Sequence, residues 1–238
     1  MAYILTINVT EGIFLYRKTK LLMAVVLIGA SFLMGKTLSV HVSGNQIKKG
    51  KSIVVLDAGH GYTDPGKIGI NKKKEKDINL SIAKKVEKKL KKQNIIVKMT
   101  RREDKGLGDT KIADMKERVK RINNTKPNLA VSIHQNSYTQ ESVKGAQVFY
   151  FTHSKEGKEA AEVMQEMFRL FDKENKRVCK GNNTYYMLRK TEVPTIIVEC
   201  GFLSNWEEAE KLSTKEYQEK VAQVICDGII HILQKQEE

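Results

Sequence analysis

The sequence predicts an α/β fold with a mostly parallel central sheet and helices on both faces. From Ser52 onward, apolar runs alternate with amphipathic segments, which is the order expected when strands and helices follow one another. Several of the apolar runs are continuously apolar over three or four residues, as in the inner strands of a sheet that is covered on both sides. The 238 residues, 40% of them hydrophobic, are enough for one sizeable domain with a buried core.

Five apolar runs are predicted to be the strands of this sheet. They read SIVVL, NIIVKM, NLAVSI, AQVFYF and TIIVE, and they occupy residues 52–56, 94–99, 128–133, 146–151 and 195–199. Their length is typical of strands, and they recur through the whole segment. We therefore expect one sheet and no second domain.

Four helices are predicted between and after these strands. The first has lysines on one side and an apolar residue at every fourth position on the other: Ile78, Ile82, Val86 and Leu90. The second is predicted to begin at a cap formed by Asp109 and Thr110 and to turn four residues inward: Ile112, Met115, Val119 and Ile122. The third is marked by Ala160, Val163, Met167 and Phe171. The last covers residues 217–233.

The N-terminal segment has the residue order of an export signal. YRKTK, at residues 16–20, precedes a short apolar run at residues 21–34. The run is short for a membrane span of about 20 residues, and no clear cleavage site follows it. A cleaved signal peptide and a retained membrane anchor therefore both stay open, and either one predicts export across the cytoplasmic membrane. The basic flank argues against the third interpretation, a buried core helix.

These observations predict three parts of the chain. A signal peptide or membrane anchor, with the start of a linker, is expected over residues 1–43, and the rest of the linker over residues 44–51. The catalytic domain is expected over residues 52–236.

The chain is strongly basic, with a net charge of +14. Residues 1–43 hold four basic residues and one acidic residue, so the remainder carries +11. Such a surface attracts polyanions, including anionic lipids and acidic wall polymers. No recognisable nucleic-acid-binding motif accompanies the charge, so nucleic acid is not an expected partner.

Polar residues stand where three of the predicted strands end. His60 follows the first strand, His134 follows NLAVSI, and Glu199 ends TIIVE, while Glu75 lies just before the first helix. Loops from neighbouring strands meet at this edge of an α/β sheet. Two histidines and a carboxylate form a common catalytic zinc environment, in which a further carboxylate can move a proton from attacking water to a leaving amine. Glu199 is the residue hardest to dismiss, because an acid within an apolar run is costly unless it is paired or functional.

Other interpretations of these residues stay open from spacing alone. A histidine at a strand end is often an ordinary loop residue, and a glutamate before a lysine-rich helix often interacts with the helix dipole. The remaining histidines have no comparable setting, and we take them as non-functional: His41, His153 and His231.

Two rival functions belong to other classes. A non-catalytic module could bind wall polymers through the +11 charge, although this leaves the buried Glu199 without a purpose. A thiol hydrolase could use Cys200, but strand alternation turns Cys200 away from the face of Glu199. The three cysteines are few and lack metal-type spacing, so we expect free thiols: Cys179, Cys200 and Cys226.

The loop around His60 is rich in glycine. Gly59 and Gly61 are expected to permit backbone angles that bulkier residues resist, so that the strand ends abruptly and His60 faces a metal. Asp57 either orients a ligand histidine through its far ring nitrogen or serves as a turn or cap carboxylate.

Five motifs resemble those of one enzyme family. They read LDAGHGYTDPG, KEKDINLSIA, VSIHQNS, KGAQVFYF and PTIIVECGFLSN, and they occur in order between Ser52 and Leu233. This series is similar to that of the zinc-dependent N-acetylmuramoyl-L-alanine amidases of the amidase-3 family. Within the family, the chain most resembles the germination-specific type that acts on spore cortex.

The resemblance implies a site and a reaction. His60, Glu75 and His134 would bind Zn²⁺, and Glu199 would be the catalytic acid and base. The reaction would hydrolyse the amide between N-acetylmuramic acid and L-alanine in peptidoglycan. In spore cortex this step permits formation of muramic δ-lactam by a deacetylase, and the expected location is the space between the forespore and mother-cell membranes. A vegetative autolysin is the alternative within the family.

The chain departs from the family pattern at a few positions near the site. Tyr62 stands where a small residue is more usual, and Gln135 and Ser137 follow the second histidine in place of alanine-like residues. These departures concern the fit of the substrate more than the chemistry. Larger members carry an inserted helix that blocks the site. Residues 135–158 are too short and too strand-like to supply one, so control must come another way, and we expect a protein activator or a localising partner.

Overall fold

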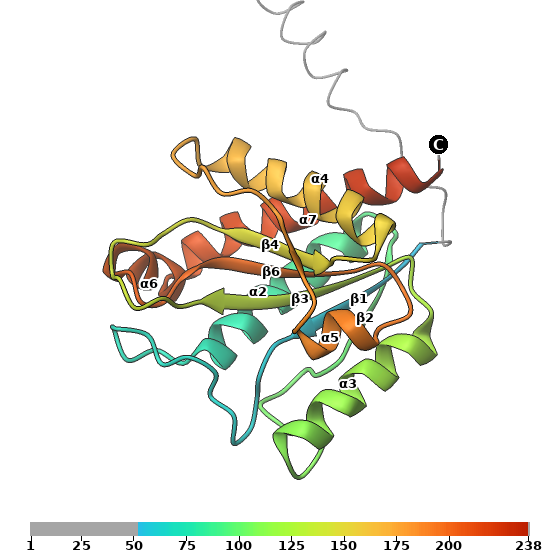
Figure 1. Ribbon diagram of the computed structural model, residues 1–238, viewed down its shortest axis with the longest axis horizontal. Coiled ribbons are helices and arrows are strands. Elements are labelled where there is room, and N and C mark those ends of the chain that lie inside the picture. The colour runs from blue at the N-terminus through green and yellow to red at the C-terminus, as the bar shows by residue number, and fades with distance from the viewer. Residues whose placement is uncertain (1–51, 238) are drawn as a thin grey trace, which may run out of the picture. The chain divides into compact units, whose positions relative to one another are not determined.

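The apolar runs pair into one six-stranded sheet, with the strand order β2-β1-β3-β6-β4-β5. A computed structural model describes residues 52–237 (Figure 1). The strands are β1 (Ile53–Ala58), β2 (Ile96–Met99), β3 (Leu129–Asn136), β4 (Gln147–Phe151), β5 (Lys180–Asn182) and β6 (Thr195–Phe202). Strands β1, β2, β3 and β6 are mutually parallel, whereas β4 pairs antiparallel with β6. All five predicted strands and the mostly parallel sheet are confirmed.

Helices connect the strands. They are α2 (Glu75–Lys92), α3 (Lys111–Thr125), α4 (Lys155–Phe171), α5 (Tyr186–Lys190), α6 (Trp206–Ser213) and α7 (Lys215–Glu237). Thr110 caps α3 as predicted, because its side chain accepts a hydrogen bond from the N–H of Ala113. The short elements β5, α5 and α6 were not predicted.

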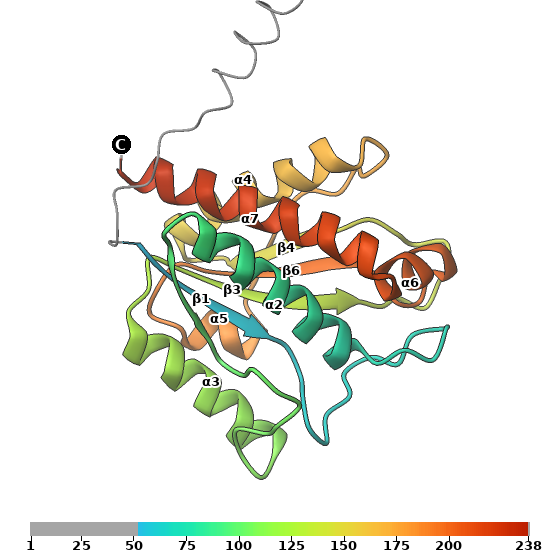
Figure 2. The same ribbon diagram turned by 180° about the vertical axis from the view of Figure 1, so that it is seen from behind.

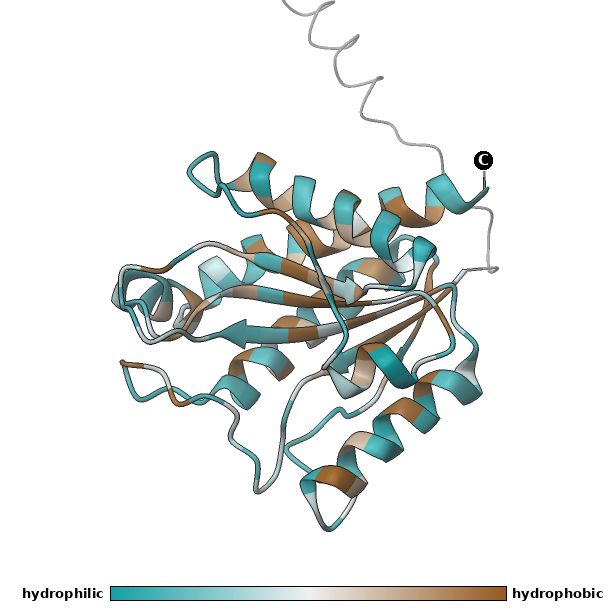
Figure 3. Ribbon diagram, in the orientation of Figure 1, coloured by the Kyte–Doolittle hydropathy of each residue, from teal (hydrophilic) through white to brown (hydrophobic). Residues whose placement is uncertain are grey.

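The sheet lies between two layers of helices. Helices α2, α4 and α7 cover one face, and Figure 2 shows α2 and α7 lying across it. The smaller helices α3 and α5 cover the opposite face. Successive residues of a strand point to opposite faces of the sheet and so contribute to both cores. Leu56 in β1 joins the core under α2 and α7, whereas its neighbour Val55 joins the cluster under α3 and α5. Apolar residues accordingly gather between the layers (Figure 3).

The prediction of which residues of α3 are buried is wrong for the first turns of the helix. Val119 and Ile122 are buried, but Ile112 is 68% exposed and Met115 is 37% exposed. Met115 lines the functional pocket described below. The first half of α3 therefore borders a pocket, and only its second half packs on the sheet.

The predicted face of α4 is displaced by about one residue. Ala160 is buried as expected, but the deepest positions further along are Met164 and Phe168, while Val163 is only partly buried and Phe171 is 36% exposed. The predicted and the observed sets of buried residues both have helical periodicity. The observed set is the one that packs against α7 and β4.

The predicted signal or anchor over residues 1–43 and the linker over residues 44–51 lie outside the described residues, as does His41. Within residues 52–237, none of the helices is long and apolar enough to cross a membrane. The three cysteines are free thiols, as predicted.

Candidate active site

The carboxyl edge of the sheet brings the four predicted site residues together. His134 lies in β3 and Glu199 in β6, and the parallel register pairs these two residues directly. His60 lies two residues beyond β1, and Glu75 is the first residue of α2. All four line the same pocket.

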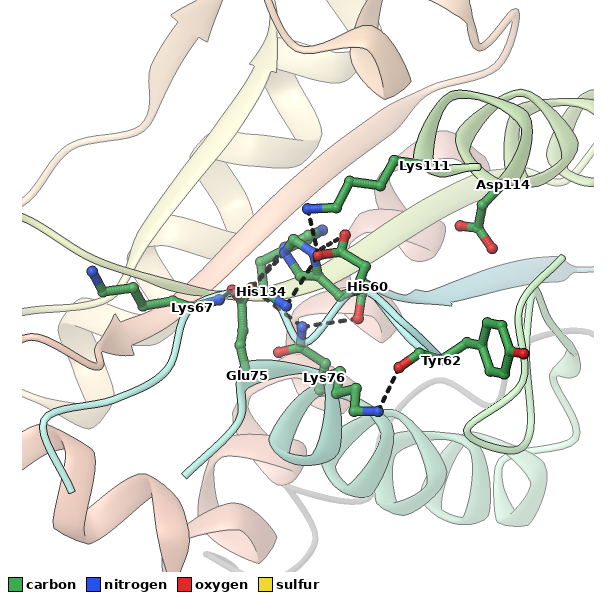
Figure 4. A network of polar contacts seen from close by, with 12 residues as sticks. His60, Tyr62, Lys67, Glu75, Lys76, Lys111, Asp114 and His134 are labelled. Carbon is green, nitrogen blue, oxygen red and sulfur yellow. Dashed lines mark hydrogen bonds and ion pairs between the residues drawn. The ribbon is translucent and has the colours of Figure 1, made fainter. Parts of the chain in front are cut away.

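Three of these residues have the arrangement of a metal site. The Glu75 Oε1 atom lies 3.2 Å from His60 Nε2 and 2.9 Å from His134 Nδ1. One potential ligand atom from each of the three residues falls within 4.8 Å of the others. The two imidazole rings meet edge to face, with centroids 4.9 Å apart. Figure 4 shows the three side chains converging.

Backbone groups hold the Glu75 carboxylate in place. Its Oε2 accepts a hydrogen bond from the N–H of Lys67 at 2.8 Å, and its Oε1 accepts one from the N–H of Gln135 at 3.1 Å. Burial raises the pKa of Glu75, but hydrogen bonds with His134 and His60 outweigh it and hold this pKa well below its usual range. The carboxyl is therefore ionised, which is the state that binds a cation.

His60 is oriented by a residue that the sequence reasoning missed. Its Nδ1 lies 2.8 Å from Asp64 Oδ2, and the other oxygen of Asp64 lies 2.7 Å from the ammonium of Lys111. A carboxylate only accepts hydrogen bonds, so Nδ1 donates to Asp64, and this contact turns the other ring nitrogen, Nε2, toward Glu75. The available signal was an acid four residues after the histidine in GHGYTD.

Two buried arginines fix the backbone of the His60 loop. Arg118 donates to the carbonyl oxygens of Ala58 at 2.7 Å and His60 at 2.6 Å. Arg101 donates to the carbonyl oxygens of Ala58 at 2.8 Å and Gly59 at 3.0 Å. These bonds hold His60 at a φ of 61°, in the left-handed region that non-glycine residues seldom adopt.

Asp57 takes neither of the two roles left open for it, the partner of a ligand histidine or a turn or cap carboxylate. Asp57 instead pairs with Arg118 Nη1 at 2.8 Å and accepts hydrogen bonds from Thr100 and Ser132 at 2.6 Å each. Burial raises its pKa, but Arg118 and the two hydroxyls outweigh burial and lower the pKa to about 2. Asp57 thus acts on His60 only indirectly, through the arginine that holds the loop.

The two loop glycines serve different purposes. Gly61 has a φ of 139°, so its predicted conformational role is confirmed. Gly59 has no such angle, but a Cβ atom there would lie 2.2 Å from the His134 ring. Gly59 is therefore needed for space, because the loop passes directly against the second imidazole.

Glu199 is an acid buried in the wall of the pocket. It is 8% exposed, and its Oε2 makes no hydrogen bond to any of the described residues. Burial is the main cause that raises its pKa to about 7, with His134 opposing the rise and Glu75 reinforcing it. A carboxyl with a pKa near neutrality can both accept and donate a proton, as general acid–base catalysis requires.

Comparison with known proteins identifies the family. The sequence model of the N-acetylmuramoyl-L-alanine amidases, Amidase_3, matches residues 54–231. The chain belongs to this family.

Characterised relatives agree. The chain is 36% identical over 186 residues to the germination-specific N-acetylmuramoyl-L-alanine amidase of Bacillus subtilis, which covers 75% of this chain and 78% of that protein. The CwlD amidase from Clostridioides difficile, solved in complex with the GerS lipoprotein, superposes with a TM-score of 0.74 at 35% identity and covers 77% of this chain and 99% of that one. The catalytic domain of CwlV from Bacillus (Paenibacillus) polymyxa superposes with a TM-score of 0.70 at 37% identity. This match covers 77% of this chain and 98% of that one.

The protein is therefore an N-acetylmuramoyl-L-alanine amidase, and the non-catalytic binding module is excluded. The thiol-hydrolase alternative fails on geometry, because Cys200 lies in the hydrophobic core under the helices, on the opposite face of β6 from Glu199. Burial also raises the pKa of the Cys200 thiol far above its usual range, which keeps it protonated.

The pocket of the amidase has a volume of about 430 Å³, within the usual range for ligand sites. Beyond the four predicted residues, its lining includes side chains that spacing could not indicate: Tyr62, Lys67, Lys111, Met115 and Tyr185. Tyr185 precedes α5 and packs edge to face on Phe149, with centroids 5.5 Å apart. No helix lies between β3 and β4, so this stretch holds no blocking helix.

Proposed function

We propose that this amidase is zinc-dependent, with His60, Glu75 and His134 as the metal ligands and Glu199 as the catalytic acid and base. The donor set supports this assignment, since two imidazole nitrogens and one carboxylate oxygen, with a position open to substrate, are typical of catalytic zinc. The observation that carries the proposal is the unpartnered Oε2 of Glu199 in the same pocket, because a buried carboxylate without a function would be costly.

Each residue then has a task in cleaving the amide between the lactyl group of N-acetylmuramic acid and L-alanine. Bound zinc supplies a Lewis acid that polarises the scissile carbonyl and makes water more acidic. Glu199 takes a proton from the attacking water and then delivers it to the departing alanine nitrogen. Asp64 holds His60 with its Nε2 toward the metal position, and the N–H of Gln135 holds Glu75.

We further propose a role in the spore cortex, where peptide removal would prepare muramic acid for δ-lactam formation needed in germination. This rests on the likeness to the germination-specific amidase and to CwlD. The N-terminal 43 residues would direct export, cleaved or retained as an anchor, and residues 52–236 would form the catalytic domain. Because CwlD was solved with a lipoprotein, we propose that a protein partner activates or localises this enzyme too.

The chemistry is tested by replacing Glu199 with Gln. Removing the general base should lower turnover of purified muropeptides by several orders of magnitude while zinc content is unchanged. Glu87→Gln is a matched control, because Glu87 is equally buried but pairs with Arg102 outside the pocket. Full activity of Glu199→Gln would refute its assignment.

The ligand set is tested by metal analysis. His60→Ala and His134→Ala should each lose most bound zinc, because too few ligands remain. His153→Ala is the control, since His153 packs on Phe151 outside the pocket and should not affect zinc. Undiminished zinc in His60→Ala or His134→Ala would show that other residues bind the metal.

The cortex role is tested in cells. Muropeptides of spore cortex should lack muramic δ-lactam when the gene carries Glu199→Gln and should regain it with the wild-type gene. Normal δ-lactam together with altered vegetative wall muropeptides would instead support the autolysin alternative.

A further inference from the structure

Tyr62, on the loop after β1, holds a backbone conformation that aromatic residues rarely adopt. Its φ is 54°, in the left-handed region. The ammonium of Lys76 donates to its carbonyl oxygen at 2.8 Å, and Asp104 accepts a hydrogen bond from its N–H at 2.6 Å. Backbone strain of this kind persists only where the surroundings fix it, and it gathers at functional sites.

Lys76 is itself buried, at 7% exposure, and its ammonium lies 2.5 Å from Asp104 Oδ2. A buried ammonium is unfavourable unless it is paired and hydrogen-bonded. Here the pairing joins the start of α2, the loop after β2 and the backbone of Tyr62. The fold thus fixes the position of this one residue from two separate segments.

The ring of Tyr62 is nevertheless 59% exposed and lines the pocket. One edge lies against the backbone of Gly106, where an added Cβ would be 3.2 Å from Tyr62 Cδ1. Its phenolic oxygen makes no hydrogen bond to any residue in 52–237. An exposed aromatic ring on a fixed backbone offers a surface for the apolar face of a ligand, and a tyrosine has few side-chain torsions to lose on binding.

Lys67 lines the same pocket and has a free charge. Its backbone exchanges two hydrogen bonds with Glu75, at 2.8 Å and 2.9 Å, which fixes its position beside the proposed metal ligand. The structure records no partner for its ammonium among the described residues. Lys111 also lines the pocket, but its charge is paired with Asp64. In Figure 4, Lys67 and Tyr62 lie on opposite sides of the group formed by His60, Glu75 and His134.

The two halves of the substrate differ in polarity and charge, as the Tyr62 ring and the Lys67 ammonium do. The scissile amide joins an uncharged sugar, whose ring has apolar C–H faces, to a peptide that carries at least its terminal carboxylate. We propose that the substrate crosses the site with its sugar against Tyr62 and its peptide carboxylate toward Lys67. This orientation rests on the proposed site residues, and it makes Tyr62 and Lys67 determinants of specificity.

The sugar side is tested with the full chain and two substrates: a muropeptide, and the same peptide bearing only the lactyl group. Both contain the scissile amide, but only the first contains the sugar ring. Tyr62→Asn, which tolerates the left-handed backbone, should raise KM for the muropeptide about 3- to 10-fold and leave kcat and the KM for the lactyl peptide unchanged. Tyr62→Phe keeps the ring and should behave as the wild type.

The peptide side is tested with muropeptides whose stem ends in a carboxylate or in an amide. Lys67→Gln should raise KM for the carboxylate form about fivefold and leave the amide form unchanged, while Lys67→Arg should keep the preference. The rise in KM caused by Lys67→Gln should also become smaller at high salt, because salt screens an exposed charge contact.

The outcomes separate the two levels of the proposal. If the wild type releases no peptide, or Glu199→Gln is as active as the wild type, the proposed function fails. If those two controls behave as expected but Tyr62→Asn affects both substrates equally, or Lys67→Gln affects both stems equally, the proposed orientation alone is overturned.

Discussion

The position of His60 depends on contacts from outside its own loop. Its backbone is held by Arg118, and its ring is held by Asp64, which in turn meets Lys111. A metal-binding histidine commonly donates its second ring nitrogen to a carboxylate in this way, which fixes the ring and makes it a better ligand. Asp64 would therefore support the proposed metal site by holding one of its ligands.

Replacing Asp64 tests this contact. Asp64→Asn should weaken zinc binding about 10- to 100-fold, because the amide no longer holds the imidazole with its negative charge. The affinity is measured by competition with a chromophoric chelator, which requires no substrate. Asp77→Asn is the control, since Asp77 is exposed in the first turn of α2. Equal affinities for Asp64→Asn and the wild type would exclude Asp64 from the metal site.

At the residue level, sequence reasoning found the groups that polarity makes conspicuous. Glu199 stands out inside an apolar strand, and His60 and His134 stand out where apolar runs end. Arg118 and Asp57 could not be assigned in the same way, because their partners depend on how α3 lies against β1. Two groups 61 positions apart in the chain form this pair, and no local pattern specifies it.

At the scale of elements, helical periodicity predicts a helix better than it predicts what each turn of the helix contacts. In α3, the second half packs on the sheet through Val119 and Ile122, but the first half borders the pocket with Met115. The pattern is the same in both halves. The elements β5 and α5 have only three and five residues, which is too short for a periodic signal.

Strand β1 and helix α3 are joined by the ion pair of Asp57 and Arg118, which predicts a pH dependence of stability. The folded pKa of Asp57, about 2, lies below its ordinary value of 3.8. Stabilisation from a depressed carboxyl pKa is complete above the unfolded pKa and is lost as the pH falls through the folded one. The window is therefore roughly pH 4 to pH 2, and the contribution is about 2 kcal/mol.

Asp57→Asn should lower the free energy of unfolding by about 3 kcal/mol at neutral pH, because Arg118 loses a buried partner. The difference between variant and wild type should then shrink as the pH falls from 4 to 2. Urea unfolding at a series of pH values measures both effects. A difference that is constant across this window would show that Asp57 does not titrate with a depressed pKa.

At the scale of the whole molecule, the two faces of the sheet have separate tasks. The face under α2, α4 and α7 is apolar along most of its length, up to Gln135 near the end of β3, and stabilises the fold. The face under α3 and α5 is apolar only in part and becomes polar toward the carboxyl edge, through Ser132 and His134 in β3. The energetically costly groups, including the unpartnered Glu199, are thereby confined to one edge and supported by a core that does not depend on them.

This division predicts how metal and stability are linked. Zinc that binds only the folded protein should raise its free energy of unfolding by about 2.7 kcal/mol at a hundredfold excess over Kd. Thermal melts with and without zinc should show this shift in the wild type and in Glu199→Gln, but not in His134→Ala. Without metal, Glu199→Gln should be at least as stable as the wild type, because it replaces a buried carboxylate that has no hydrogen-bond partner on Oε2. A zinc-dependent shift that persists in His134→Ala would place the metal elsewhere, and a clear loss of stability in metal-free Glu199→Gln would mean that Glu199 supports the fold.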